Sequence, residues 1–313
     1  MSEAIVFNPI FLKTNQGHGN ARRASLKNCR NNLVALMDAD DISVPHRFQI
    51  QLDRFMRDKD LSIVGGQISE FIGDVSNVIG IRRVPEKHKE IIEFSKKRCP
   101  MNQMSVMVNK NAVECAGGYI DWYCNEDYYL WIRMIESGFK FENVSNVLVN
   151  VRAGEEMSSR RGGWKYFKSE AKLQTYMLRK GFIFLPRYIY NVGARFGGEV
   201  ILSNKMRAGL FKLMREKNLV ASEHLEEDFL NDDNKIDMLS KYPPFSVAIC
   251  VYGKDNPEWF DTALASVINQ TVKPSEIVLV VDGSIPDGIQ GVIDKYAEIC
   301  EGGTTKCDKN FKK

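Results

Sequence analysis

The sequence predicts an α/β fold with a largely parallel sheet, and three features indicate it. Apolar runs at 33–37, 244–253 and 276–284 are typical of buried strands. Amphipathic stretches of helical period follow these runs, and two strand–helix units in succession imply parallel strands. Acidic residues stand at or directly after the ends of two of these strands. Because ligands bind at the carboxyl edge of open α/β sheets, we expect these acids to face a binding site.

Hydrophobic periodicity predicts the elements of the N-terminal half. The stretch after 33–37 opens at Ser43 and Pro45 and then carries apolar residues at helical spacing. Gly65 and Gly66 lie within another apolar run, where they permit close approach of a neighbouring backbone. We expect strands at 8–14, 33–37, 61–71 and 104–109, and a strand pair at 139–154. We expect a loop at 15–19 and helices at 20–29, after Pro45, at 85–97 and at 125–138.

The C-terminal half changes character twice. Residues 164–217 are helical in pattern and rich in aromatic and basic residues, and Pro186 is expected to break or kink the helix just after Leu185. Residues 219–240 are acidic with few large apolar residues, which is typical of a linker. We then expect strands at 244–253 and 276–284, helices at 256–271 and 286–300, and a loose polar tail at 301–313.

Composition limits the class of protein. The 313 residues carry a formal net charge of +3, which gives no electrostatic case for binding nucleic acid. The seven cysteines are an odd number without a CxxC pair, so they indicate neither a disulfide framework nor a zinc site and favour a reducing cytosol. The start of the chain does not resemble a secretory signal, and no stretch approaches the roughly 20 apolar residues that span a bilayer.

Three segments resemble family 2 glycosyltransferases, the inverting nucleotide-sugar enzymes of the GT-A fold. "SVAICVYGKDNPEWFDTALASVINQTVKPSEIVLVVDGS" resembles the opening of their catalytic domain, and "NQGHGNARRASLKNCRNNLVALMDADDISVPHRFQIQ" resembles the part with their DxD motif. "GGYIDWYCNEDYYLWIRM" resembles the part with their ED motif at a helix start. "RCPMNQMSVM" and "VRAGEEMSSRRGGWKYFKSE" are similar to the subgroup that builds bacterial O-antigen and capsule repeat units. The resemblance implies a GT-A, Rossmann-like nucleotide-sugar-binding sheet with flanking helices.

The order of these segments differs from the family. The segment that comes first in family members lies here at 244–300, and the segment that follows it begins near residue 8. We interpret this order as a circular permutation, which exposed loops tolerate. The alternative is a fragment of a tandem enzyme with two truncated domains. The predicted parts are a central and acceptor-side part at 1–163, a helical extension at 164–218, a linker joining the original termini at 219–243, a nucleotide-binding half at 244–300 and a loose tail at 301–313.

Asp38, Asp40 and Asp41 form a cluster of carboxylates at the end of the strand at 33–37. Hard divalent cations prefer such oxygens, and a cation that bridges the donor diphosphate neutralises charge on the leaving group. The resemblance implies that Asp40 and Asp41 face the ribose and a Mn²⁺ or Mg²⁺ ion, and that Asp38 supports the cluster. The alternative is an acidic helix start, because acids in a first turn also favour the macrodipole.

The resemblance places the nucleotide beside the ends of the two C-terminal strands. Asp282 matches the family's acid that accepts a hydrogen bond from uracil N3–H, although Val281 stands where a second acid is common. Val251 and Tyr252 match residues that line the base pocket, and Arg22 matches an arginine near the nucleotide. An Asp-Gly turn is the alternative for Asp282, and a solvated basic helix face is the alternative for Arg22.

Asp127 is the predicted general base. An inverting transfer needs one carboxylate to take the acceptor hydroxyl proton while its oxygen attacks the anomeric carbon. The resemblance places Asp127 in this role, with Glu126 orienting the acceptor or capping the helix. Helix capping is the alternative for both acids. Arg160 and Arg161, followed by two glycines, indicate a loop that clamps a donor or lipid diphosphate, and a solvated basic loop is the alternative.

The resemblance implies an enzyme that moves a hexose, with galactose favoured, from a UDP-sugar to a glycan or an undecaprenyl-diphosphate-linked glycan. Aromatic and basic residues at 176–196 suit an interfacial helix, and a helix packed across the domain is the alternative. The resemblance favours the first and implies a cytoplasmic protein in peripheral contact with the inner face of the bacterial plasma membrane. A nucleotidyltransferase is disfavoured because "VYGKDNPEWF" is not a glycine-rich, basic loop. A catalytically dead nucleotide-sugar-binding module stays open.

Overall fold

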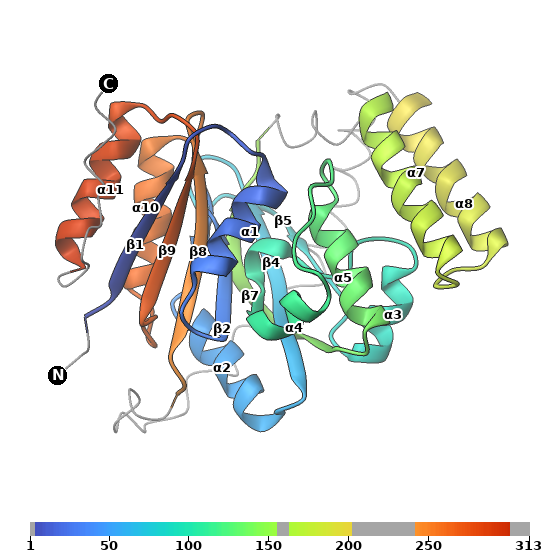
Figure 1. Cartoon of the computed structure of the whole chain (residues 1–313), viewed down its shortest axis with the longest axis horizontal. Helices are drawn as coiled ribbons and strands as arrows, with labels where there is room; N and C mark the ends of the chain where they lie inside the picture. The colour runs from blue at the N-terminus through green and yellow to red at the C-terminus, as the bar shows by residue number, and fades with distance from the viewer. Residues whose placement is uncertain (1–3, 155–162, 202–241, 301–313) are drawn as a thin grey trace.

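The chain folds around one mixed sheet. The computed structural model describes residues 4–154, 163–201 and 242–300. In this part of the chain nine strands pair in the order β1-β9-β8-β2-β6-β4-β7-β3, with β5 beside β4 (Figure 1). The strands are β1 (Val6–Leu12), β2 (Leu33–Asp38), β3 (Ile42–Ser43), β4 (Leu61–Phe71), β5 (Val78–Arg82), β6 (Met107–Asn109), β7 (Lys140–Arg152), β8 (Phe245–Tyr252) and β9 (Glu276–Asp282).

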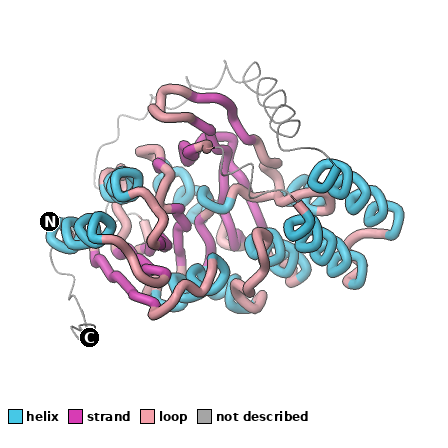
Figure 2. Tube along the Cα trace, turned by 90° about the horizontal axis from the view of Figure 1, so that it is seen from above, coloured by secondary structure: helices cyan, strands magenta, loops and turns pink. Residues whose placement is uncertain are grey.

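Helices pack around this sheet, as the view from above in Figure 2 also shows. The α-helices are α1 (His18–Asn28), α2 (Arg47–Arg57), α3 (His88–Ser95), α4 (Lys110–Cys115), α5 (Glu126–Glu136), α7 (Trp164–Arg179), α8 (Leu185–Arg195), α10 (Pro257–Ile268) and α11 (Asp287–Ile299). A 3₁₀ turn lies at Gln103–Ser105 and a short π-helix at Phe196–Ile201.

The two C-terminal strands lie in the parallel half of the sheet, between β1 and β2. β8 runs parallel to both β2 and β9, and β1 runs parallel to β9. Every residue of β9 is buried, as expected for a strand covered on both faces. In register, Asp38 lies opposite Cys250, and both Leu12 and Tyr252 lie opposite Asp282. The carboxyl ends of four strands, drawn from both ends of the sequence, therefore meet at one edge.

Alternating side chains along β8 separate two apolar cores. Val247 lies in a core with Phe260 of α10, whereas Ala248 lies in a second core with Leu26 of α1 and Trp131 of α5. Successive residues of a strand point to opposite faces, so one strand contributes to both layers. Burial of each large apolar side chain contributes about 1.5–3 kcal/mol. The C-terminal segment is thus an integral part of the core.

The α7–α8 hairpin packs against α5. A third apolar cluster consists of Tyr128 and Ile132 of α5, Leu173 and Met177 of α7, and Ile183 before α8, and Tyr188 of α8 packs against it. Arg195 of α8 donates through Nε to Glu170 of α7 at 2.5 Å, and both side chains are largely buried. The hairpin is therefore fixed to the helix that begins with Glu126.

Most predicted elements are confirmed, among them the strand at 61–71 and both C-terminal strand–helix units. The predicted strand pair at 139–154 is wrong, because Lys140–Arg152 is one long strand, β7, parallel to β4. The register of β7 against β4 shifts at residues 145–146, beside Gly66 and Gln67. There Gln67 Nε2 donates to the Val144 carbonyl at 2.9 Å, which satisfies the irregular backbone.

Two other boundaries differ from the prediction. The strand expected at 104–109 is shorter, because the 3₁₀ turn at Gln103–Ser105 precedes β6. The helical region breaks before Leu185: α7 ends at Arg179, and Gly181 takes the positive φ of +70° that favours glycine. Pro186 lies in the first turn of α8, where its missing N–H has no helical partner to lose. The predicted linker before residue 242, the end of the helical extension and the tail lie outside the described residues.

Candidate active site

Four of the predicted site residues, three of them acidic, lie around the carboxyl edge of the sheet. Asp38 ends β2, Tyr252 ends β8 and Asp282 ends β9, while Glu126 begins α5. Helix α1 and the loop that precedes it make direct contacts with three of these positions. The site is therefore built by one short segment that reaches several elements.

The loop before α1 holds the carboxylate of Asp282, a residue that is only 6% exposed. Oδ1 accepts the N–H of Gln16 at 2.7 Å, and Oδ2 accepts the N–H of Gly17 at 3.1 Å. Gly283 permits this approach, since its φ is +91° and a Cβ there would lie 2.9 Å from the Asn15 nitrogen. Charge-assisted hydrogen bonds of this kind fix the orientation of a carboxylate. Asp282 therefore has a structural link to the N-terminal loop beyond that of a simple Asp-Gly turn.

Arg22 of α1 bridges the two acidic motifs. Nη2 donates to Oδ1 of Asp38 at 3.2 Å, and Nη1 donates to Oε1 of Glu126. Although burial lowers the pKa of Arg22, the carboxylates of Asp38 and Glu126 outweigh it, and the net shift is upward. The guanidinium is thus a fixed positive charge between the motifs. Its predicted contact with a nucleotide stays a prediction.

Glu126 and Asp127 have different surroundings. Burial raises the pKa of Glu126 to about 7, against the opposing effect of its partner Arg22. Asp127 is half-buried, and its Oδ1 accepts the N–H of Tyr128 at 2.6 Å. Cys99 Sγ lies 3.8 Å from the other oxygen of Asp127. Within the described chain Asp127 forms no ion pair, so its carboxylate is the more available of the two for a proton transfer.

The three carboxylates after β2 do not share one environment. Asp38 contacts Arg22, whereas Asp41 is 2% exposed and its Oδ1 accepts the N–H of Arg152 at 3.0 Å. Burial, together with repulsion from Asp40 and Asp38, raises the pKa of Asp41 well above its usual range. No group of three His, Cys, Asp or Glu side chains in the described ranges is placed to hold a metal ion.

The carboxylate oxygens of this cluster nevertheless fit a hard divalent cation. Mg²⁺ is usually bound through one or two carboxylates together with substrate phosphates, without a complete protein cage. Asp38 and Asp40 are half-buried acids at the edge of the sheet, and a cation would offset the charge that crowds this cluster. Asp38 and Asp40 therefore stay candidate ligands, and Asp41 stays one through Oδ2, because only its Oδ1 accepts the N–H of Arg152.

Val251 and Tyr252 differ in what their side chains can contact. Val251 is 1% exposed and belongs to the apolar core, so its side chain does not line an open pocket. Tyr252 is half-buried, and its N–H donates to Asp255 Oδ2 at 2.9 Å. The predicted place of Tyr252 beside a nucleotide base stays a prediction. Arg160 and Arg161 lie outside the described residues, and their role as a clamp stays a prediction.

The sequence reading missed a buried polar support beneath the acidic cluster. Arg47 is fully buried, and its Nη2 donates to the Leu36 carbonyl at 2.7 Å, two residues before Asp38. Gln51, one turn later, donates from Nε2 to the Val64 carbonyl at 2.7 Å. Burial lowers the pKa of Arg47 to about 9, although Asp38 and other acids raise it. Two polar residues at i, i+4 on an apolar helix face are the signal that points to such a support.

The mixed sheet and its acidic carboxyl edge define a glycosyltransferase domain of the GT-A fold. The family "Glycosyl transferase family 2" matches residues 4–114 and 246–308, which together exceed half of the chain. The chain belongs to this family. Both matched segments contribute strands to the same sheet, so the family assignment and the fold describe one domain.

Curated relatives are bacterial glycosyltransferases. An uncharacterized glycosyltransferase of Haemophilus influenzae is 38% identical over 63% of this chain and 73% of that protein. The amylovoran biosynthesis glycosyltransferase of Erwinia amylovora is 37% identical over 52% and 60%. An Escherichia coli UDP-Gal:alpha-D-GlcNAc-diphosphoundecaprenol beta-1,3-galactosyltransferase is 34% identical over 59% of this chain and 66% of that protein. The chain therefore spans less than two thirds of the length of the Erwinia and Escherichia relatives. A Pyrobaculum calidifontis mannosyltransferase solved with GDP-Man and Mn²⁺ matches with a TM-score of 0.38 at 15% identity, over 67% of this chain and 56% of that one.

Proposed function

We propose that the chain transfers a hexose from a UDP-sugar, with inversion, to a glycan or to a glycan linked to undecaprenyl diphosphate. The observation that carries the proposal is the joining of Asp282, Asp38 and Glu126 by α1 and the loop before it. Membership of family 2 supports the reaction class. The relative named for galactosyl transfer to a lipid diphosphate supports the acceptor class and galactose as the sugar.

The residues divide the work of an inverting transfer. Asp127 takes the acceptor hydroxyl proton while the oxygen attacks the anomeric carbon. Arg22 holds the two acidic motifs in place and adds a preorganised positive charge near the leaving diphosphate. Asp282, oriented by the loop before α1, accepts a hydrogen bond from the uracil ring. A bound Mn²⁺ or Mg²⁺ ion would supply further positive charge for the leaving group.

Calorimetric titration with UDP, in the presence and absence of Mn²⁺, tests the donor site. We expect one site per chain and tighter binding with the cation. Asp127→Asn should abolish transfer yet keep UDP affinity, and Asp121→Asn, at an exposed acid in the loop before α5, should change neither. Loss of UDP binding in Asp127→Asn would contradict the assignment of the base. A folded chain that binds UDP but transfers no sugar would favour the dead nucleotide-sugar-binding module, and a folded chain that binds no UDP would contradict the donor site.

We also propose that the chain is a circularly permuted member of the family. The family match falls in two separate segments, and β8 and β9 lie between β1 and β2 in the sheet. In the alternative, a tandem fragment, the C-terminal strands would pair with another copy of the chain. Sedimentation equilibrium in the presence of UDP separates the two, because the permuted enzyme binds UDP as a monomer. UDP binding by dimers alone would contradict the permutation.

Peripheral contact with the inner face of the plasma membrane completes the proposal and implies a cytoplasmic location. No described helix is both long and apolar enough to cross a bilayer. α8 and the residue before it instead expose apolar side chains, with Phe184 81%, Ile189 62% and Tyr190 68% exposed. Such side chains suit the head-group region. Cosedimentation with anionic vesicles should fall in Ile189→Ser, and an unchanged bound fraction would contradict this contact.

A further inference from the structure

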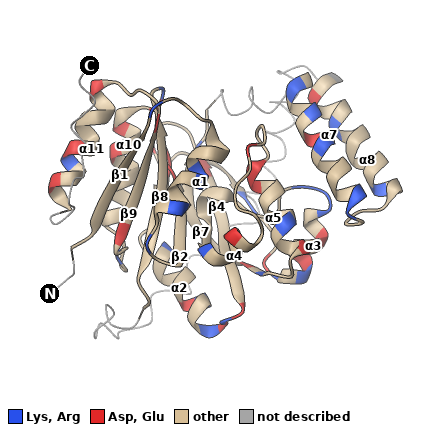
Figure 3. Ribbon diagram, in the orientation of Figure 1, with Lys and Arg blue, Asp and Glu red and all other residues tan. Residues whose placement is uncertain are grey.

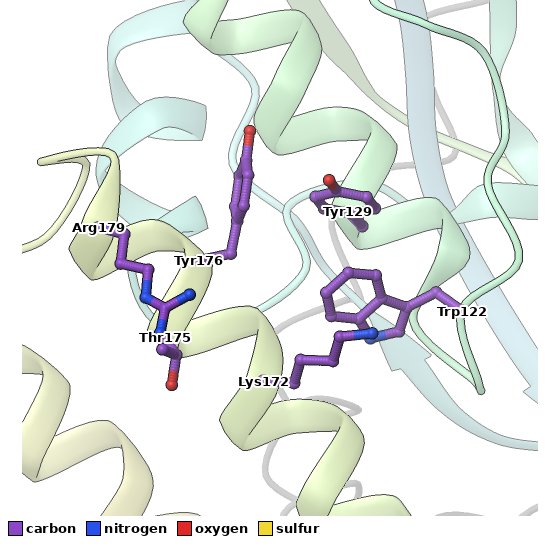
Figure 4. Close-up of a pocket in the computed structure, with 6 residues that line it drawn as sticks. All are labelled: Trp122, Tyr129, Lys172, Thr175, Tyr176 and Arg179. Atoms are coloured by element: carbon purple, nitrogen blue, oxygen red, sulfur yellow. The ribbon is translucent and has the colours of Figure 1, made fainter.

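A groove lies between α5 and α7, apart from the acidic edge of the sheet. It has a volume of about 520 Å³ and is lined by Trp122, Tyr129, Lys172, Thr175, Tyr176 and Arg179 (Figure 4). None of these residues belongs to the acidic motifs or to the proposed nucleotide site. Aromatic walls combined with a few polar groups are the usual composition of a ligand site.

Three aromatic rings form one wall. The ring centroids of Trp122 and Tyr129 lie 4.4 Å apart, and those of Tyr129 and Tyr176 lie 4.9 Å apart with a perpendicular arrangement. All three side chains are half-buried, so part of each remains open to the groove. Tyr176 also donates its hydroxyl to Glu136 at 2.7 Å, which fixes its ring. Arg133 lies over the Tyr129 ring, 4.5 Å from its centroid, and the exposed Lys172 lies over Trp122. The wall is therefore an apolar platform whose Trp122 face opens to the C–H face of a sugar ring when Lys172 turns away.

Cations face this platform. Lys172 Nζ lies 4.2 Å from the Trp122 ring centroid, and Arg179 lies two turns further along α7. No ion pair with an acidic side chain is present at Lys172 or Arg179 in the described part of the chain. Basic side chains recur along α7, and Lys165 lies over the Tyr123 ring at 4.0 Å (Figure 3). The groove thus offers positive charge without an internal counter-ion, which suits a phosphate group.

The groove is connected to the proposed catalytic pair. Tyr129 lies one turn after Glu126 on α5, so both side chains lie on the same side of the helix. The loop before α5, which carries Trp122, is fixed to α7. Asn125 Nδ2 donates to Ser169 Oγ at 3.2 Å, and Ser169 Oγ donates to the Tyr123 carbonyl at 2.5 Å. A ligand in the groove therefore lies next to the start of α5.

We propose that this groove binds a glycosyl phosphate, the phosphorylated end of the acceptor. Lys172 turns from the Trp122 ring to the phosphate oxygens, which Arg179 also contacts, and the sugar packs against the Trp122 face that this movement frees. This identification as an acceptor subsite rests on the proposed transferase function, whereas binding itself does not. Phosphate recognition by the two cations and sugar recognition by the rings are separable, because they involve different side chains.

Ligand-observed NMR titration tests binding without the need for activity. The probes are glucose 1-phosphate, glucose and inorganic phosphate, added to the whole chain with UDP and the diamagnetic Mg²⁺ present to occupy the donor site. Glucose 1-phosphate should bind at least tenfold more tightly than glucose or inorganic phosphate alone, since the contacts of the sugar ring and of the phosphate combine. Inorganic phosphate that binds equally well would overturn the proposal, as would no binding of glucose 1-phosphate.

Charge-matched variants locate the site. Lys172→Glu/Arg179→Glu should weaken glucose 1-phosphate binding about tenfold or more, because each lost charge contact is worth about 1 kcal/mol at an exposed site. Lys89→Glu/Arg187→Glu makes the same change in net charge on exposed positions outside the groove and should leave the affinity unchanged. Equal loss in both variants would indicate general electrostatic attraction and overturn the proposal.

The aromatic wall needs its own variant. Trp122→Leu keeps an apolar side chain while removing the platform, and its thermal unfolding midpoint verifies that the loop still folds. It should weaken binding of glucose 1-phosphate and leave binding of inorganic phosphate unchanged. Unchanged affinity for glucose 1-phosphate would overturn the sugar contact.

Transfer assays distinguish failure of this inference from failure of the proposed function. If the enzyme is active, the Lys172→Glu/Arg179→Glu variant should raise the KM for a phosphorylated acceptor about tenfold and leave the UDP affinity unchanged. An active enzyme with an unchanged acceptor KM in that variant would overturn the acceptor subsite alone. A chain that binds glucose 1-phosphate in the groove but transfers no sugar would overturn the transferase proposal and the acceptor role together, while binding in the groove would stand.

Discussion

Replacing Arg22 by methionine should destabilise the protein in a pH-dependent way. Methionine retains an unbranched apolar side chain but removes the guanidinium that contacts Asp38 and Glu126. The side chains of Arg22 and Glu126 are only 16% and 8% exposed, so their pair is largely shielded from water. Removing one partner of a buried pair costs about 3–5 kcal/mol when the other stays charged. Glu126 limits that cost by taking up a proton.

The pH dependence follows from the pKa of Glu126, which is raised from 4.5 to about 7 in the folded state. An acid with a raised native pKa binds its proton more tightly when folded. Stability is therefore greatest below pH 4.5 and falls as the pH rises toward 7, at about 1.4 kcal/mol per pH unit. In the wild type this fall stops near pH 7. Without the charge of Arg22 the native pKa rises further, so the variant loses up to about 1.4 kcal/mol more by pH 8.

The excess is the additional loss of unfolding free energy that Arg22→Met causes at pH 8 compared with pH 6. Urea unfolding at both pH values measures it in the wild type, Arg22→Met, Glu126→Gln and the double variant. The excess at pH 8 should vanish in the Glu126→Gln background, because the titrating carboxyl is gone. Lys27→Met, an exposed change on the same helix, should show no excess. An equal loss of stability at both pH values, or an excess that persists in the double variant, would refute the reasoning.

Two further substitutions test the supports of the site. Gly283→Ala should lower the free energy of unfolding by about 1–3 kcal/mol, because both its φ of +91° and the nearby Asn15 backbone oppose a Cβ. Gly73→Ala, where φ is +70° and no atom lies close to a Cβ, should cost less. Equal decreases of the thermal unfolding midpoint in the two variants would show that the Asn15 backbone adds no steric cost. Arg47→Met should cost about 1–3 kcal/mol, because the Leu36 carbonyl loses its donor. Calorimetry should also show weaker UDP binding in this variant, and unchanged affinity would contradict a positioning role.

Local sequence patterns predicted much of the fold because they report burial along one element. Apolar runs identified the strand at 61–71 and the C-terminal strand–helix units within three residues of their ends. The strand pair expected at 139–154 was wrong, because the chain continues as one strand through Ser145 and Asn146. In β7 a shift in register and the amide of Gln67 accommodate them instead. Such compensation comes from a neighbouring strand and leaves no trace in the local pattern.

The sequence by itself determined the class of the fold and the acidic motifs at the strand ends, since both depend on short-range periodicity and on residue type. Only the tertiary structure decided which groups these acids meet. Arg22 contacts Glu126 across 104 residues, and Asp282 accepts from Gln16 across 266. The same packing places Val251 in the core and Asp41 against β7. Partners so distant in sequence are brought together by the order of strands in the sheet, and that order is set by burial of the whole core.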